Sequence, residues 1–313
     1  MKKDKIFAIA CFSSFIVAVY LIFSGFGFYK IDALADTAST TATIVNAAPT
    51  IGTFTINGGD ASITLTEGDI TSVVASTTVT VTDDNGCEDI STTTANFYRT
   101  DKTSSCSANL YDCYTVAYCS VVGSGNTCDG SSDTSADYEC SVTLTYYTDP
   151  TDDNASASST EWTMLVTADD GDDTGTNTDT IEVSSLNAID LTTPIAYGSL
   201  SLGASSTNQE QTITNTGNVR LDMQFSGTDM TCTAGSVVAT QQKYGTSTIS
   251  VWGDAPYALS TSPTETDWDV AKRTGATSTS AVHWMLQAPS SGADGSCSGT
   301  NTLTAVNDDV TAD

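Results

Sequence analysis

The sequence predicts an all-β protein built of antiparallel β-sandwiches, and two observations carry this prediction. After residue 36, apolar and polar residues alternate in short runs, and clusters of Gly, Asn and Asp separate those runs. Alternation with a period of two is the pattern of a half-buried strand, and such clusters are typical of turns. We find no run with the helical period after residue 36. Many short strands without intervening helices favour two antiparallel sandwich domains, at residues 50–185 and 190–313.

The first 35 residues predict export from the cytoplasm. Three lysines within residues 1–5 precede an uncharged apolar run over residues 6–28, which is long enough for a helix that crosses a bilayer. The sequence Ala-Leu-Ala at residues 33–35 has small residues where signal peptidase cleaves. We interpret residues 1–35 as a cleaved signal peptide or an uncleaved membrane anchor, so the protein is expected to be secreted or displayed at the cell surface. Residues 36–49, rich in Thr and Ala, are interpreted as a stalk.

The charge composition excludes nucleic-acid binding and disfavours catalysis. The chain has 38 Asp and Glu, 10 Lys and Arg and one His, for a formal net charge of −28. A nucleic-acid-binding protein needs a basic face for the phosphates, which this composition cannot supply. A His-based triad or metal site would depend on His283 alone, and its neighbours Val282 and Trp284 predict that this side chain points to the surface. Paired carboxylates can serve a glycosidase, but no pair is distinguished by its sequence context, so we expect no enzyme.

Eight of the nine cysteines follow the export segment and predict four disulfides, because an even number of cysteines in an exported chain is typical of a disulfide framework. No two are spaced C-x-x-C, so neither a zinc ribbon nor a thioredoxin-like redox site is supported. Two stand alone in the second half and are expected to pair with each other. The sequence leaves the pairing of the other six open. The eight residues are Cys87, Cys106, Cys113, Cys119, Cys128, Cys140, Cys232 and Cys297.

In the first region, strands are expected where large apolar residues alternate with Thr and other polar residues. Thr suits the outward positions because β-branched residues fit a pleated surface. Trp162 lies on one of these runs and is expected in the core. The expected strands are residues 63–65, 79–82, 142–146, 162–166 and 181–183.

The second region repeats this pattern after a boundary near residues 184–193, where a short linker leads to Pro194. Trp252 and Trp284 lie on alternating runs and are also expected in the core. The expected strands are residues 200–202, 212–214, 221–225, 237–238, 249–252, 282–286 and 303–306.

Several of these motifs resemble a known family. Residues 79–87 (VTVTDDNGC) resemble the strand-and-turn signature of PKD-type immunoglobulin-like domains of microbial surface proteins. Residues 162–173 (WTMLVTADDGDD), followed by TIEV at 180–183, are similar to the last two strands of such domains, and residues 202–221 resemble β-sandwich repeats of exported microbial proteins. The resemblance implies immunoglobulin-like sandwiches with extracellular, structural or adhesive roles and without catalysis. The Cys-rich residues 101–140 depart from the PKD pattern and are interpreted as an insert.

Three acidic turns are candidate sites for Ca²⁺. Carboxylates in a turn can gather the oxygen ligands that Ca²⁺ binds at about 2.3–2.6 Å. None of the turns matches the EF-hand loop pattern, and the alternative is that these are solvated loop tips, because Asp is favoured in turns. Glu88 and Asp89 follow the first turn, and Asp149, Asp152 and Asp153 form the third. The residues expected as ligands, in the first two turns, are Asp83, Asp84, Asp169, Asp170, Asp172 and Asp173.

Aromatic residues outside the alternating runs are candidate binding residues. Tyrosines in a disulfide-pinned segment can form a rigid binding surface, whereas the alternative is that they cover the disulfides. Trp268, between two aspartates, could stack on a sugar ring or anchor a partner, although singly exposed aromatic residues are common. Asn154 begins an N-glycosylation sequon, Asn-Ala-Ser. The Cys-rich insert contains Tyr111, Tyr114 and Tyr118, which are the binding candidates, and Tyr138.

Together these observations predict an exported structural or adhesive cell-surface protein that is not an enzyme. The alternative is a secreted glycan- or protein-binding module that uses the Cys- and Tyr-rich insert. The expected partners are other cell-surface components, further copies of the chain or glycans, and the membrane is contacted only through an uncleaved N-terminal helix. The candidate cofactor that the sequence suggests is Ca²⁺.

Overall fold

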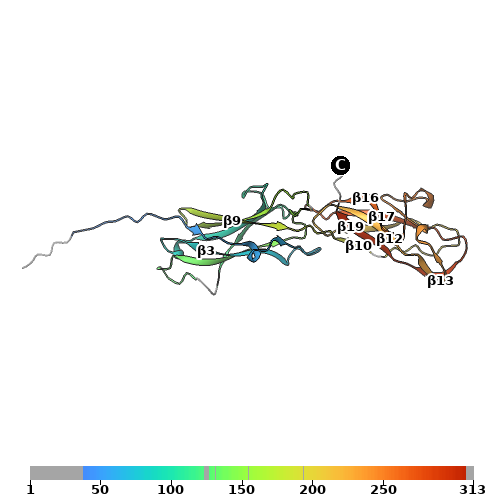
Figure 1. Ribbon diagram of the computed structural model, residues 1–313, viewed down its shortest axis with the longest axis horizontal. Coiled ribbons are helices and arrows are strands. Elements are labelled where there is room, and N and C mark those ends of the chain that lie inside the picture. Colours follow the sequence, from blue (N-terminus) through green and yellow to red (C-terminus); the bar gives the residue numbers. More distant parts are fainter. Residues whose placement is uncertain (1–37, 123–126, 131, 154, 193, 308–313) are drawn as a thin grey trace, which may run out of the picture. The chain divides into compact units, whose positions relative to one another are not determined.

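The structure is a computed structural model that describes residues 38–307 apart from residues 123–126, 131, 154 and 193. The described residues are all-β, with several antiparallel sheets (Figure 1). Their helical content consists of 3-10 turns, η1 (Ile56–Gly58), η2 (Cys87–Asp89), η3 (Ala239–Gln241) and η4 (Trp252–Asp254). The predicted all-β class is therefore confirmed. The predicted export segment lies outside the described residues, and within them no helix is both long and apolar enough to cross a membrane.

The N-terminal region, residues 46–186, folds into two sheets. Its strands are β1 (Thr50–Ile51), β2 (Ser62–Ile63), β3 (Val73–Thr82), β4 (Thr92–Arg99), β5 (Cys113–Tyr118), β6 (Ser120–Val121), β7 (Ser135–Leu144), β8 (Trp162–Asp169) and β9 (Thr174–Val183). One sheet has the order β1-β3-β7-β6 and the other has the order β2-β9-β8-β4-β5.

Both sheets contribute one face to a shared hydrophobic core. In β3, Val79 and Val81 are buried while Thr78 and Thr80 between and beside them are exposed, as the alternation predicts. In β8, Trp162 is fully buried, and its ring stacks on Phe97 of β4 with 4.8 Å between the ring centroids. The predicted core position of Trp162 is confirmed.

The C-terminal region, residues 187–307, contains two sheets and a ribbon. Its strands are β10 (Ile189–Leu191), β11 (Gln209–Asn215), β12 (Leu221–Gly227), β13 (Met230–Val237), β14 (Gln242–Gly245), β15 (Tyr257–Ala258), β16 (Thr264–Val270), β17 (Thr279–Leu286), β18 (Ala293–Ser298) and β19 (Asn301–Asn307). The sheets have the orders β10-β11-β17-β14-β15 and β16-β12-β19, and β13 and β18 form the ribbon.

Aromatic rings fill the core of the C-terminal region. The Phe225 ring of β12 lies 4.3 Å from the Tyr244 ring of β14, 5.3 Å from Trp268 and 6.0 Å from Trp284, measured between centroids. Trp284 is fully buried, as predicted. Trp252 is only half-buried, because it lies in the η4 turn and its ring packs under the Lys243 ammonium at 4.1 Å.

Three details of the strand prediction are wrong. β2 pairs in parallel with β9, with Ser62 opposite Glu182, because the whole run of strands from β3 to β8 connects the two. Residues 200–202 form no strand, since the chain turns there and Ala204 N–H donates to Ser201 C=O at 2.9 Å. Residues 249–252 lead into η4 instead of a strand.

The segment expected to be an insert is an integral part of both sheets. It supplies β5, which pairs with β4, and it supplies β6 and more than half of β7. β7 pairs with β3 over its whole length, from Val73 opposite Leu144 to Thr82 opposite Ser135. Residues 101–140 therefore help to build the core instead of projecting from it.

The four predicted disulfides are present, and Cys232 pairs with Cys297 as expected. Cys119 lies where the chain passes from one sheet to the other. Its N–H donates to Thr93 C=O of β4 at 2.9 Å, and the next residue, Ser120, pairs with Glu139 of β7. The Cys119–Cys140 disulfide thus joins the two sheets at one edge. The other pairs are Cys87–Cys128 and Cys106–Cys113.

Candidate functional site

The first two acidic turns use their carboxylates as hydrogen-bond acceptors for their own backbone. Asp83 is buried, and its Oδ1 accepts from the Asn85 N–H at 2.8 Å, whereas Asp84 is exposed. Asp170 Oδ1 accepts from the N–H groups of Asp172 at 2.8 Å and Asp173 at 2.7 Å. These donors hold the pKa of the Asp170 carboxyl below its usual value.

The same two turns accept hydrogen bonds from Asn46 and Ala47, where the N-terminal segment meets the sheets. Asn46 Nδ2 donates to Asp170 Oδ2 at 2.9 Å, and the Ala47 N–H donates to Asn85 Oδ1 at 2.6 Å. In the third turn, Asp152 accepts from the Ser185 N–H at 2.8 Å. Among the described residues, no three His, Cys, Asp or Glu side chains come together in a group that could hold a metal ion. The structure therefore gives the Asp83 and Asp170 carboxylates a structural role as hydrogen-bond acceptors.

One of the three tyrosines expected to bind a partner, Tyr114, belongs to the core. Tyr114 is buried, its hydroxyl donates to Leu110 C=O at 2.8 Å, and burial raises its pKa. Tyr138 is also buried, and Tyr111 is half-buried. Tyr118, with 77% of its surface exposed, is the one of the four that presents its ring to solvent.

The expectations that Trp268 and His283 are exposed are wrong. Trp268 is 4% exposed, and its Nε1–H donates to Ser280 Oγ at 2.9 Å. It lies on β16, where Thr266, Trp268 and Val270 alternate inward. His283 is 6% exposed because residues 246–255 cover that face of the sheet, and its Nδ1 lies 3.1 Å from Asn208 Nδ2. The sequon residue Asn154 lies outside the described residues.

A charged cluster that the sequence analysis missed surrounds Asp149. Its side chain is 4% exposed, and it pairs with Arg99 of the N-terminal region and with the Lys272 ammonium of the C-terminal region, the latter at 2.6 Å. Burial raises the pKa of the Asp149 carboxyl, and the two cations oppose that rise. Arg99 also forms a two-pronged pair with Asp101. The available signal was Lys272-Arg273, the one pair of adjacent basic residues after the export segment.

Contacts of Asn218 and Arg273 complete this junction between the two regions. Asn218 is fully buried, and its Nδ2 donates to the C=O groups of Thr148 and Ser184, both at 3.0 Å. Its Oδ1 accepts from the Leu186 N–H at 2.7 Å. The Arg273 guanidinium lies over the Tyr147 ring at 4.5 Å. The junction, residues 145–149, 184–188, 215–219 and 272–273, therefore fixes the linker on both sides.

Two adjoining cavities in the C-terminal region are the other candidate site. The larger, which we call the apolar groove, has a volume of about 790 Å³ and lies between residues 195–202 and the β13–β18 ribbon. The smaller, the amide pocket, has a volume of about 260 Å³. Ile195, Tyr197 and Met230 line both cavities, so the two adjoin.

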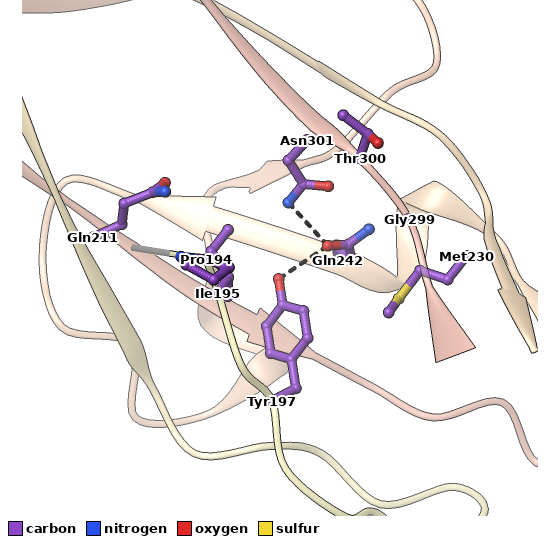
Figure 2. A pocket seen from close by; sticks show the side chains of 9 residues that line it. All are labelled: Pro194, Ile195, Tyr197, Gln211, Met230, Gln242, Gly299, Thr300 and Asn301. Atoms are coloured by element: carbon purple, nitrogen blue, oxygen red, sulfur yellow. Dashed lines mark hydrogen bonds between the residues drawn. The ribbon is translucent and has the colours of Figure 1, made fainter. Parts of the chain in front are cut away.

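Figure 2 shows the polar centre of the amide pocket. Gln242 Oε1 accepts from the Tyr197 hydroxyl and from Asn301 Nδ2, each at 3.0 Å. Gln242 is 2% exposed, and its Nε2 has no hydrogen-bond partner among the described residues. Burial raises the pKa of Tyr197, so its hydroxyl stays protonated and able to donate. The site thus offers a buried amide donor beside an apolar groove.

The lining of this site carries almost no charge. The nine residues of the amide pocket include no Asp, Glu, Lys, Arg or His, and the apolar groove includes one, Asp294. Sequence reasoning did not identify the site, because its lining comes from segments far apart in the sequence and residues 200–202 were expected to form a strand. Searches for related proteins add nothing, since no protein-family model matches the chain and no curated protein matches it.

Proposed function

We propose that the chain is an exported, non-enzymatic structural component of a microbial cell surface, with adhesive contacts to further copies or to other surface components. In this proposal the N-terminal and C-terminal regions are two immunoglobulin-like sandwich domains, the first of the PKD type. Each region has its own hydrophobic core and its own disulfides, which supports two domains. Disulfides persist mainly in oxidising surroundings outside the cytoplasm, which supports export.

The observation that carries the structural role is the junction. Domains joined in one chain move relative to each other by default, unless their interface holds them. In this chain a fully buried Asn218 ties the linker at Ser184 and Leu186, and a buried Asp149 pairs with cations from both regions. A junction built in this way resists bending, and resistance to bending is what a spacer or surface subunit needs.

The alternative of a binding module that uses the Cys- and Tyr-rich segment is not carried forward. That segment supplies strands to both sheets, and Tyr114 and Tyr138 are buried in the core. Their burial leaves Tyr118 as the exposed aromatic ring of that segment, which supports the structural role over the binding module.

The proposal is tested by locating the native protein in the cells that make it. Washed cells are fractionated, and the envelope fraction is imaged by electron microscopy with gold-labelled antibody against the chain. Labelling of a regular surface structure, with most of the protein in the envelope fraction, supports the proposal. Recovery of most of the protein as free monomer in the medium would overturn it.

A further inference from the structure

The amide pocket contains a buried donor that lacks an acceptor. Gln242 lines the cavity and is 2% exposed, and its Nε2 forms no hydrogen bond to the described residues. A buried donor without a partner costs free energy, so a ligand that brings an oxygen acceptor to this point is favoured. A peptide C=O group is such an acceptor.

The rest of the site favours an uncharged ligand with aliphatic side chains, because its lining is nearly uncharged and combines aliphatic side chains with polar groups. Ile195, Leu200, Leu202, Met230, Val237 and Leu286 supply apolar surface to the groove. The chain has a formal net charge of −28, so the near absence of charge in this site distinguishes it from the rest of the molecule. An acidic partner surface is repelled by the rest of the molecule, whereas an uncharged aliphatic peptide is not.

The chain itself carries a peptide of this kind. Residues 38–45, Ala-Ser-Thr-Thr-Ala-Thr-Ile-Val, hold no charge. All of them are exposed, and Ile44 at 86% and Val45 at 80% are the two most exposed large apolar side chains among the described residues. β-Branched residues such as these favour the extended conformation in which a peptide lies along a groove.

The peptide of one copy cannot fill the groove of the same copy. Asn46 and Ala47 are held at the Asp170 and Asn85 turns, and Ile44 precedes Asn46 by two residues, a reach of about 7 Å. Strand β9 alone, which leads from the Asp170 turn to the junction, is about 33 Å long, and the groove lies beyond the junction. The occupant must therefore come from another molecule.

We infer that residues 38–45 of one copy bind in the apolar groove of a second copy, with a backbone C=O accepting from Gln242 Nε2 and with Ile44 and Val45 in contact with the groove. The inference rests on the proposed function, because it names the partner of a surface subunit as a further copy of the chain. Donor and groove lie at different places on each molecule, so the contact is head-to-tail and can repeat from copy to copy, as in strand-donating subunits.

The test uses the full-length, disulfide-bonded protein with three kinds of variant. I44D/V45D places charge in the donor segment, and Leu202→Asp places charge in the groove, where Leu202 is 55% exposed so that folding is retained. Ala196→Asp, at another exposed groove position, repeats the groove test. The controls are T53D/T55D, at exposed positions outside the donor segment, and Val251→Asp, at an apolar residue that is also 55% exposed but lies outside the groove.

Sedimentation velocity at rising protein concentration gives the result. We expect the wild type and both controls to associate, and the donor and groove variants to associate about tenfold more weakly or not at all. A mixture of I44D/V45D with Leu202→Asp should form a dimer and nothing larger, because one partner keeps its groove and the other keeps its donor.

Three outcomes would overturn the inference. If the wild type associates and the donor and groove variants associate equally well, the inference fails while the proposed function stands. If each variant is monomeric and their mixture is also monomeric, donor and groove do not bind each other. If the wild type is monomeric at every concentration and is absent from the cell envelope, the proposed function fails together with the inference.

Discussion

Asp149 is a buried acid whose removal leaves two cations facing each other. The variant Asp149→Asn should lower the free energy of unfolding by about 3 kcal/mol, because it leaves Arg99 and Lys272 without their shared partner at the junction. The matched control is Asp269→Asn. Its pair with Arg220 is exposed, at 42% and 36% of the side chains, and such pairs contribute about 0–1 kcal/mol. Urea unfolding measures both, and equal small losses would show that the junction pair contributes little.

Because Tyr244 is buried, we expect the free energy of unfolding to fall at alkaline pH. Burial raises its pKa to about 12, above the value of about 10 for tyrosine in an unfolded chain. The unfolded state therefore ionises first, so the contribution to stability is complete below pH ~10 and is lost as the pH rises toward about 12. The loss for this group is about 2 kcal/mol. Tyr244→Phe should flatten the curve of unfolding free energy against pH. The control Tyr118→Phe, at an exposed tyrosine, should leave the curve unchanged. Parallel curves for the wild type and both variants would contradict the assignment of the alkaline loss to Tyr244.

At the scale of elements, the disulfides close loops of very different length. Cys232–Cys297 closes a separation of 65 residues and links β13 to β18, a ribbon of two strands that cannot be stable alone. Cys106–Cys113 closes a separation of 7 residues. From chain entropy, removing the first pair with Ser should cost about 4 kcal/mol and removing the second about 2 kcal/mol. Thermal or urea unfolding of the two double variants tests this order, and a larger loss for the short loop would contradict it.

Elements with large inward side chains could be predicted from the sequence, and others could not. β8 and β12 alternate clearly because Trp, Met, Leu and Phe occupy their inward positions. β4 was missed because Thr93 and Ala95 occupy inward positions where a small or polar residue hides the period. β16 was missed because its outward Glu and Asp residues gave Trp268 the appearance of an isolated surface residue.

The candidate sites show the same limit. The acidic turns were identified, but only the folded chain reveals that their carboxylates accept hydrogen bonds from Asn46 and from the local backbone. Asp149 was named as part of a turn, whereas its partner Lys272 is more than a hundred residues away in sequence. The apolar groove is lined by irregular chain between residues 195 and 202, where the short Leu-Ser-Leu alternation at 200–202 wrongly predicted a strand.

For the whole molecule, charge opposes association between copies. With a formal net charge of −28, two copies repel each other at low ionic strength, while the donor segment and the groove are almost uncharged. At 0.1 M, added salt screens the repulsion between charges that lie more than about 10 Å apart. It leaves an apolar contact intact. Association should therefore strengthen from low salt to moderate salt, measured by light scattering at fixed protein concentration. Weakening over that range would indicate that ion pairs hold the copies together.

The central claim is that this chain is a subunit of an extracellular assembly. The most direct measurement is the mass distribution of the native protein, released gently from its own cells and followed by sedimentation with and without a Ca²⁺ chelator. We predict ordered multimers that persist on chelation, because the Asp83 and Asp170 carboxylates already accept hydrogen bonds from the chain. A monomer in both conditions would contradict the claim that the chain is a subunit, and multimers that dissolve on chelation would contradict the purely structural role of the acidic turns.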